Sequence, residues 1–255
     1  MKKVLGISFL FFAFIALVSC QEDEDPQPTT GKIVFTFDHY FDNDELVIFD
    51  KKYATQNGDS INIEELKYII SNIRVLNPGA GISFREKDSY HLIKVPDEGF
   101  SDEIVINNVH AGTYNTLEFF VGLDSAMNFA PESAPKLFLD EGMFWEWNTG
   151  YKFFVLEGRY FPSPVIFSGL VLHIGDQANL AKFQWDLSGG QEIEVKVGKT
   201  TRVNITAQVA ELFRNPKTIN LGNSSYRDVM ALPISGEYKT NYENGFWSLS
   251  SVENP

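Results

Sequence analysis

The chain has a single cysteine among its 255 residues, so an intramolecular disulfide is excluded. Lysine and arginine are also scarce, because 21 of them stand against 34 aspartates and glutamates and leave a formal net charge of −13. Proteins that bind nucleic acid need basic side chains to neutralise phosphates, so we expect no nucleic-acid partner. An acidic surface by itself mostly gives solubility.

The sequence also lacks the motifs of several enzyme classes. It has no Gly-x-Ser-x-Gly nucleophile elbow, no Gly-x-x-x-x-Gly-Lys phosphate loop and no Gly-x-Gly-x-x-Gly dinucleotide fingerprint. Paired carboxylates for glycoside hydrolysis are neither shown nor excluded in so acidic a chain. We therefore expect a binding protein rather than an enzyme.

The single cysteine, Cys20, ends a segment typical of a lipoprotein signal peptide. Met1-Lys2-Lys3 precedes an apolar run, Val4–Val18, which is shorter than the roughly 20 residues of a transmembrane helix. Leu17-Val18-Ser19-Cys20 resembles a lipobox, in which the cysteine is acylated and becomes the first residue of the mature chain. We predict a signal peptide at residues 1–19 and a membrane anchor on Cys20.

Residues 20–30 are predicted to be a flexible tether. An acidic block, Gln21–Asp25, is followed by the proline-containing stretch Pro26–Thr30, and neither can bury a core. The block resembles the acidic export signal of Bacteroidota lipoproteins, although it is also consistent with a linker that is only solvated. We expect an outer membrane lipoprotein on the cell surface or the periplasmic face.

The rest of the chain, residues 31–255, contains no linker-like change of composition and is predicted to be one domain. Alternation of apolar and polar residues with period two predicts half-buried strands. The predicted single strands are Ile33–His39, Leu66–Leu76 and Tyr114–Gly122. Residues 193–197 and 203–205 are predicted to form a hairpin around Gly198-Lys199. A second strand pair is predicted from Tyr151–Tyr160 and Val165–Ile174, which are separated by Pro162 and Pro164. Ala207–Phe213 is the best candidate for a short helix. We predict an all-β fold, a single antiparallel β-sandwich domain with few short helices.

Four histidines offer metal-binding nitrogen: His39, His91, His110 and His173. None forms a close His-x-x-x-His pair, so the fold would have to assemble any site that they share. His39 ends the apolar face of the first predicted strand, and His173 lies within a strand-like run. From spacing alone, each is more often a hydrogen-bonded core histidine than a ligand, and His91 and His110 look ordinary.

An acidic turn after the first strand is a candidate for calcium. Asp38, Asp42, Asn43, Asp44 and Glu45 lie close together in sequence, and calcium prefers such oxygen ligands. Their spacing does not follow an EF-hand loop, and a solvated acidic turn is the simpler interpretation.

The most unusual segment is 142–153, which contains Trp145, Trp147 and three further aromatic residues. Core packing with an aromatic corner explains such a composition. Two functional interpretations also remain, a carbohydrate-stacking platform and a redox-active tryptophan.

Several landmarks together resemble the MbnP-like copper-binding proteins, and they span most of the chain after the tether. They are Asp38-His39, Leu66–Ile73, Ala111–Tyr114 followed by Phe120–Asp124, Met143-Phe144-Trp145-Glu146-Trp147 with Gly150-Tyr151, and His173-Ile174-Gly175. The Met-Phe-Trp-x-Trp segment with its Gly-Tyr is specific, and the other pieces are weak alone.

The resemblance implies a cell-envelope β-sandwich for copper acquisition or homeostasis. It implies a site made of histidines and a tryptophan oxidised to kynurenine by a diheme partner enzyme related to cytochrome c peroxidases. Carried onto this chain, the metal ligands are His39 and His173, and the modified residue is Trp145 or Trp147. Imidazole nitrogen suits copper.

The chain departs from some relatives at Asn128-Phe129, where a histidine is expected beside the asparagine. This difference implies a weaker or differently built copper site. The alternative function is a glycan-binding or structural surface lipoprotein without metal, which requires Trp145 and Trp147 to form a platform that faces solvent.

Overall fold

The computed structural model describes residues 29–95, 103–130, 133–145 and 150–255. The predicted signal peptide and Cys20 therefore lie outside the described residues, as does Trp147. No helix in the described part of the chain is long and apolar enough to cross a membrane.

One sheet contains the first and last strands of the fold. Its members are β16 (Trp247–Glu253), β14 (Thr200–Gln208), β1 (Thr30–Phe41), β2 (Asp44–Glu45) and β7 (Glu103–His110). β1 lies between β7, its antiparallel neighbour, and β14, which runs parallel to it. Along β1, the side chains of Phe35, Phe37 and His39 are buried while Asp38 is exposed, as the alternation predicts.

The second sheet is built around β4 (Ser60–Asn77), an 18-residue strand. The hydrogen-bonded order of its strands is β12 (Ala181–Asp186), β9 (Thr116–Val121), β4, β10 (Lys152–Ser163), β11 (Ile166–Gly175) and β15 (Asp228–Val229). Three short strands also pair with β4, namely β3 (Tyr53–Ala54), β5 (Ile82–Arg85) and β6 (Tyr90–Lys94). The predicted strand pair at 151–174 is confirmed as the antiparallel hairpin of β10 and β11.

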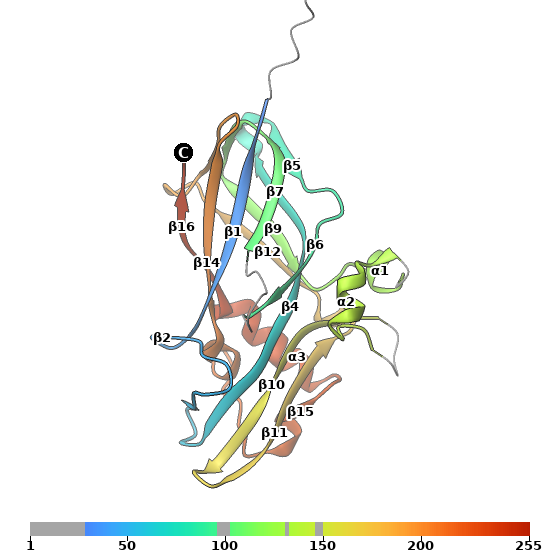
Figure 1. Ribbon diagram of the computed structural model, residues 1–255, viewed down its shortest axis with the longest axis vertical. Helices are drawn as coiled ribbons and strands as arrows, with labels where there is room; N and C mark the ends of the chain where they lie inside the picture. The colour runs from blue at the N-terminus through green and yellow to red at the C-terminus, as the bar shows by residue number, and fades with distance from the viewer. Residues whose placement is uncertain (1–28, 96–102, 131–132, 146–149) are drawn as a thin grey trace, which may run out of the picture.

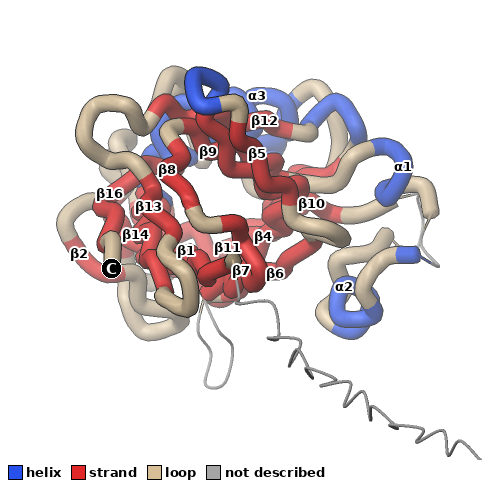
Figure 2. The backbone as a smooth tube through the Cα atoms, turned by 90° about the horizontal axis from the view of Figure 1, so that it is seen from above, coloured by secondary structure: helices blue, strands red, loops and turns tan. Residues whose placement is uncertain are grey.

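The helices are short and lie in the connections between strands. They are α1 (Ser125–Asn128), α2 (Lys136–Asp140), α3 (Ile234–Asn241), the 3-10 turns η1 (Pro78–Ala80), η3 (Gln177–Asn179), η4 (Val209–Phe213) and η5 (Ser224–Tyr226), and the π-helical turn η6 (Tyr242–Phe246). Figures 1 and 2 show α1 and α2 together on one side of the molecule, beyond β4 and β6. The β-sandwich prediction is confirmed, with the addition that β1–β14 and β11–β15 pair in parallel.

The hairpin predicted around Gly198-Lys199 is wrong. The turn exists, but β13 (Ile193–Val195) pairs with β8 (Gly112–Tyr114), while β14 pairs with β1 and β16. The start of β1 takes the backbone bonds that a hairpin would have used, since Gly198 N–H donates to Thr30 and Lys32 N–H donates to Lys199. These partners are distant in sequence, so the local pattern does not reveal them.

Two clusters of buried side chains lie on opposite faces of the second sheet. The main core fills the space between the sheets and includes Tyr68 of β4 and Phe154 of β10. A smaller cluster covers the outer face of this sheet and consists of Ile69, Leu123, Phe138, Met143, Tyr151, Phe153 and Val155. We call this smaller cluster the outer core.

Candidate functional site

The two candidate histidines lie on opposite sides of the second sheet. His39 hydrogen bonds the hydroxyl of Tyr68, whose side chain belongs to the main core. His173 lies directly across β10–β11 from Val155, whose side chain belongs to the outer core. Cross-strand partners point to the same face, so His173 lies on the outer face. The described structure therefore does not bring the two imidazoles together on one ion.

His39 is a buried core residue with its own hydrogen-bond partner. Its side chain is 6% exposed, and its Nε2 lies 3.0 Å from the Tyr68 hydroxyl. Burial lowers the pKa of His39 to about 4, against a smaller raising effect of a hydrogen bond with the Phe37 backbone. The imidazole is therefore neutral at physiological pH.

His173 forms the centre of a second constellation, with Glu157 and Trp145. Its Nε2 lies 2.6 Å from Glu157 Oε1, and the two residues come from neighbouring strands, β11 and β10. The indole of Trp145 packs edge-on against the imidazole, with ring centroids 5.9 Å apart. Trp145 is 3% exposed. It therefore cannot serve as the solvent-facing platform that glycan binding requires.

Backbone hydrogen bonds between residues 143–145 and 150–152 hold Trp145 in place. Trp145 N–H donates to the carbonyl of Gly150, and Lys152 N–H donates to the carbonyl of Met143. The buried Oδ1 of Asn128, at the end of α1, accepts the backbone N–H of Tyr151. Gly150 has φ +99°, and a Cβ there would lie 2.7 Å from that Oδ1, so the Gly-Tyr of the sequence landmark is required by this packing.

The end of β11 also leaves room for the indole. A Cβ on Gly175 would lie 2.8 Å from Trp145 Nε1 and 2.5 Å from the carbonyl oxygen of Tyr151. The landmark His173-Ile174-Gly175 therefore has a structural explanation, because His173 packs on Trp145 and Gly175 gives the indole its space.

Charged side chains surround this constellation. Burial lowers the pKa of His173, and the charges of Lys152 and Lys67 lower it further, while Glu157 opposes them. Lys152 Nζ lies 5.3 Å from the Trp145 ring centroid. Lys67 is itself buried and donates to Glu65 and to the Glu141 carbonyl. A neutral imidazole is the form that binds metals.

A cavity of about 290 Å³ reaches the constellation from the Glu157 side. Its lining consists of Ile48, Phe49, Glu64, Glu65, Leu66, Lys94, Val95 and Glu157. Glu157 is 43% exposed at its side chain, whereas His173 is 13% exposed. Glu157 is therefore the member of the pair that solvent reaches.

No motif of the sequence singles out Glu157. In the structure Glu157 lies opposite Val171, and this places it diagonal to His173 on the same face. A register shift lies between Tyr160 and the turn at Ser163 and Ile166, so counting back from that turn would put Leu172 opposite Glu157 and His173 on the other face. The local sequence therefore gave no signal for this contact.

The remaining sequence candidates lie elsewhere. Phe129, where a histidine is expected, is 54% exposed and has no metal-binding atom. In the acidic turn, Asp42 pairs with Arg214 and Asp44 pairs with Lys51, which favours the interpretation of a solvated turn. Across the described ranges, no group of three or more His, Cys, Asp or Glu side chains could hold a metal ion.

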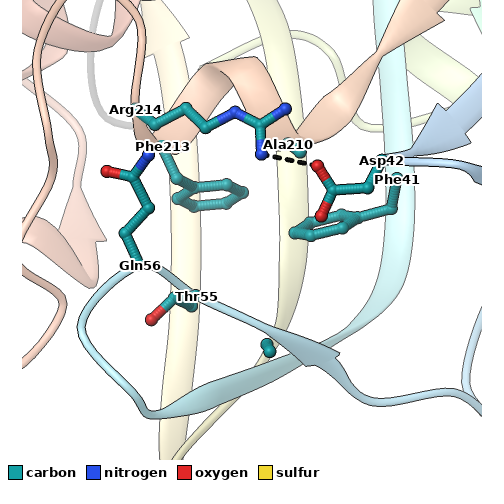
Figure 3. A pocket seen from close by; sticks show the side chains of 8 residues that line it. Phe41, Asp42, Thr55, Gln56, Ala210, Phe213 and Arg214 are labelled. Carbon is teal, nitrogen blue, oxygen red and sulfur yellow. Dashed lines mark hydrogen bonds and ion pairs between the residues drawn. The ribbon is translucent and has the colours of Figure 1, made fainter.

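A second hollow, of about 180 Å³, lies beside the acidic turn (Figure 3). Its walls include the rings of Phe41 and Phe213 and the ion pair of Asp42 with Arg214. Arg214 is also bonded by Glu211. Because two carboxylates neutralise this guanidinium, the hollow offers little attraction to an anion.

Comparisons with known proteins match the chain to one family model. The model named MbnP matches residues 30–231, and this segment ends before α3 and β16. Among solved structures, MbnP from Methylosinus trichosporium is similar, with 16% identity, a TM-score of 0.47, and coverage of 74% of this chain and 80% of that one. No curated protein matches.

Proposed function

This chain belongs to the MbnP family, and we propose that it is a cell-envelope lipoprotein that binds copper for metal acquisition or homeostasis. The observation that carries the proposal is the packing of buried Trp145 against His173. The Nε2 atom of His173 lies 2.6 Å from Glu157 Oε1. Trp145 and His173 belong to the family landmarks, and both lie on the outer face of the second sheet.

The histidine of this constellation suits copper, because imidazole nitrogen is a good ligand for this metal. We assign His173 as the protein ligand, and we leave His39 out of the ligand set because the second sheet separates it from the outer face.

Glu157 has a defined task in this arrangement. When Nε2–H of His173 donates to the carboxylate, the lone pair of the neutral ring is on Nδ1. A carboxylate that accepts the second N–H of a metal-binding histidine fixes its tautomer and raises its basicity. Glu157 therefore orients His173 for binding through Nδ1.

Trp145 is the residue we assign to oxidation, by an enzyme partner of the diheme class. Its intact indole has an N–H donor and no usable lone pair. Oxidation adds two oxygen atoms from peroxide or dioxygen across the indole C2–C3 bond, and hydrolysis then releases C2 as formate. The product, kynurenine, has an aromatic amine and a ketone beside His173.

The location follows from the N-terminal segment. The predicted lipid on Cys20 and the tether at 20–30 precede β1, which begins at one end of the long axis of the molecule (Figure 1). This placement supports a domain held at a membrane surface by its N-terminus.

The proposal is tested by mass spectrometry and metal analysis of the full chain purified from its native host. We expect bound copper and a mass change at Trp145 that matches exchange of one carbon for one oxygen. Unmodified tryptophans and no copper after loading would contradict the proposal.

Two histidine variants locate the site. His173→Ala should lose stoichiometric copper, whereas His39→Gln should retain it. Loss of copper in a folded His39→Gln variant would instead support the two-histidine arrangement that the resemblance implies.

A further inference from the structure

A hydrogen-bonded tyrosine and histidine lie in the middle of the main core. The Tyr68 hydroxyl lies 3.0 Å from His39 Nε2, and Tyr68 is fully buried. The rings packed against Tyr68 are those of Phe37, Phe154, Phe246 and Trp247, at centroid distances between 5.5 and 6.3 Å. This pair takes no part in the proposed copper site.

The direction of the hydrogen bond follows from the other contact of the imidazole. His39 also hydrogen bonds the Phe37 backbone, and this contact raises the pKa of His39, so the ring is the donor there. A neutral imidazole has one N–H, and its second nitrogen accepts. Tyr68 therefore donates its hydroxyl proton to His39 Nε2.

Neighbouring oxidisable side chains lack such a proton acceptor. The Nε1 of Trp247 is buried without a hydrogen-bond partner among the described residues. The hydroxyl of Tyr242 donates to the backbone carbonyl of Asn179, which is a far weaker base than imidazole. An oxidised ring in this cluster can therefore release its proton most readily at Tyr68.

A short route of rings connects Tyr68 with the surface. Trp247 lies 5.5 Å from Tyr68 and 5.3 Å from Phe183 by ring centroids. Phe183 is only half-buried, and Phe119 connects it to the similarly half-buried Trp185, with centroid distances of 4.9 and 5.1 Å. A one-electron oxidant at this edge of the second sheet is therefore within a few ring contacts of Tyr68.

We propose that Tyr68 is a redox-active tyrosine and that His39 is its proton acceptor. An outer-sphere one-electron oxidant removes an electron through Trp247, and the hydroxyl proton moves to His39 Nε2. The products are a neutral tyrosyl radical and an imidazolium. Re-reduction returns the electron to Tyr68, and the proton moves back from the imidazolium. The pair thus holds one oxidising equivalent inside the core reversibly.

The test is flash photo-oxidation of the copper-free full chain with ruthenium tris-bipyridine and a sacrificial electron acceptor. Transient absorption and electron paramagnetic resonance report the tyrosyl radical. We expect a long-lived radical in the unsubstituted protein, its loss in Tyr68→Phe, and its persistence in the matched control Tyr242→Phe. In His39→Gln we expect Tyr68 oxidation to slow about 100-fold, as for removal of a positioned base.

A measurement on the unsubstituted protein covers the case in which a variant fails to fold. Electron–nuclear double resonance should detect an exchangeable proton hydrogen-bonded to the radical oxygen, and this coupling should disappear in D2O. A radical signal unchanged in Tyr68→Phe, an unchanged rate in folded His39→Gln, or a radical without the exchangeable coupling would each overturn the proposal.

Discussion

The Nε1 atom of Trp145 lies 2.8 Å from the position that a Cβ atom on Gly175 would occupy. The indole and the last residue of β11 therefore share one small space on the outer face of the second sheet. His173, two residues earlier on the strand, packs against the same indole.

Gly175→Ala should displace Trp145 from His173. The added methyl group also meets the carbonyl oxygen of Tyr151 at 2.5 Å, and such overpacking costs about 1–3 kcal/mol of unfolding free energy. Denaturant unfolding and copper titration measure the two effects. Gly169→Ala on the same strand is the matched control, because among the described residues no atom beyond its chain neighbours lies within 4 Å of its added Cβ. Equal stability and copper affinity in the two variants would contradict this account.

Glu157→Gln should weaken copper binding without unfolding the protein. The amide keeps an acceptor near His173 Nε2 but loses the negative charge that raises the basicity of the ring. Changes at such orienting carboxylates typically cost about 10–100-fold in metal affinity. Competition with a chromogenic copper chelator measures the affinity.

The control for that change is Glu65→Gln. Glu65 lies directly opposite Glu157 on β4, but its carboxylate bonds Lys67. A similar loss of affinity in both variants would indicate a general effect of negative charge rather than the orientation of His173.

His39 should make the protein less stable as the pH falls from about 6.5 to 4. Burial lowers the folded-state pKa of His39 to about 4 from 6.5, so between these values the unfolded chain binds a proton that the folded chain excludes. The contribution of His39 to the free energy of unfolding is fully present above pH 6.5. It decreases by about 3 kcal/mol as the pH falls to 4. Urea unfolding across this range measures it.

The variant His39→Gln isolates this effect from other titrating groups. Its unfolding free energy should fall less between pH 6.5 and 4 than that of the unsubstituted protein. Parallel pH profiles for the two proteins would rule out His39 as the source.

Asn128→Ala should loosen the packing of Tyr151 beside the segment that carries Trp145. The substitution removes the Oδ1 that accepts the backbone N–H of buried Tyr151, and an unsatisfied buried donor costs about 1–3 kcal/mol. Hydrogen exchange of the Tyr151 amide should become faster. Asn128→Asp keeps an oxygen at the same position and should preserve most of the protection of that amide, which separates this effect from a general loss of packing in α1.

Much of the fold was predictable because its strands are half-buried. Along β1 and β9 the alternation of apolar and polar side chains matches the two faces of each strand, and a tight turn made the β10–β11 hairpin visible. The hairpin at 193–205 was predicted wrongly, since the competing partners Thr30 and Lys32 come from the other end of the chain.

The sequence by itself determined the β-rich class, the family landmarks and the identity of the candidate residues, because alternation and short motifs are local properties. Tertiary structure decided which of these residues meet. Alternation predicts that His39 is buried, but it does not say which sheet face or cluster any histidine faces. That choice depends on pairing between distant strands, and it places His39 with Tyr68 in the main core and His173 with Trp145 and Glu157 on the outer face.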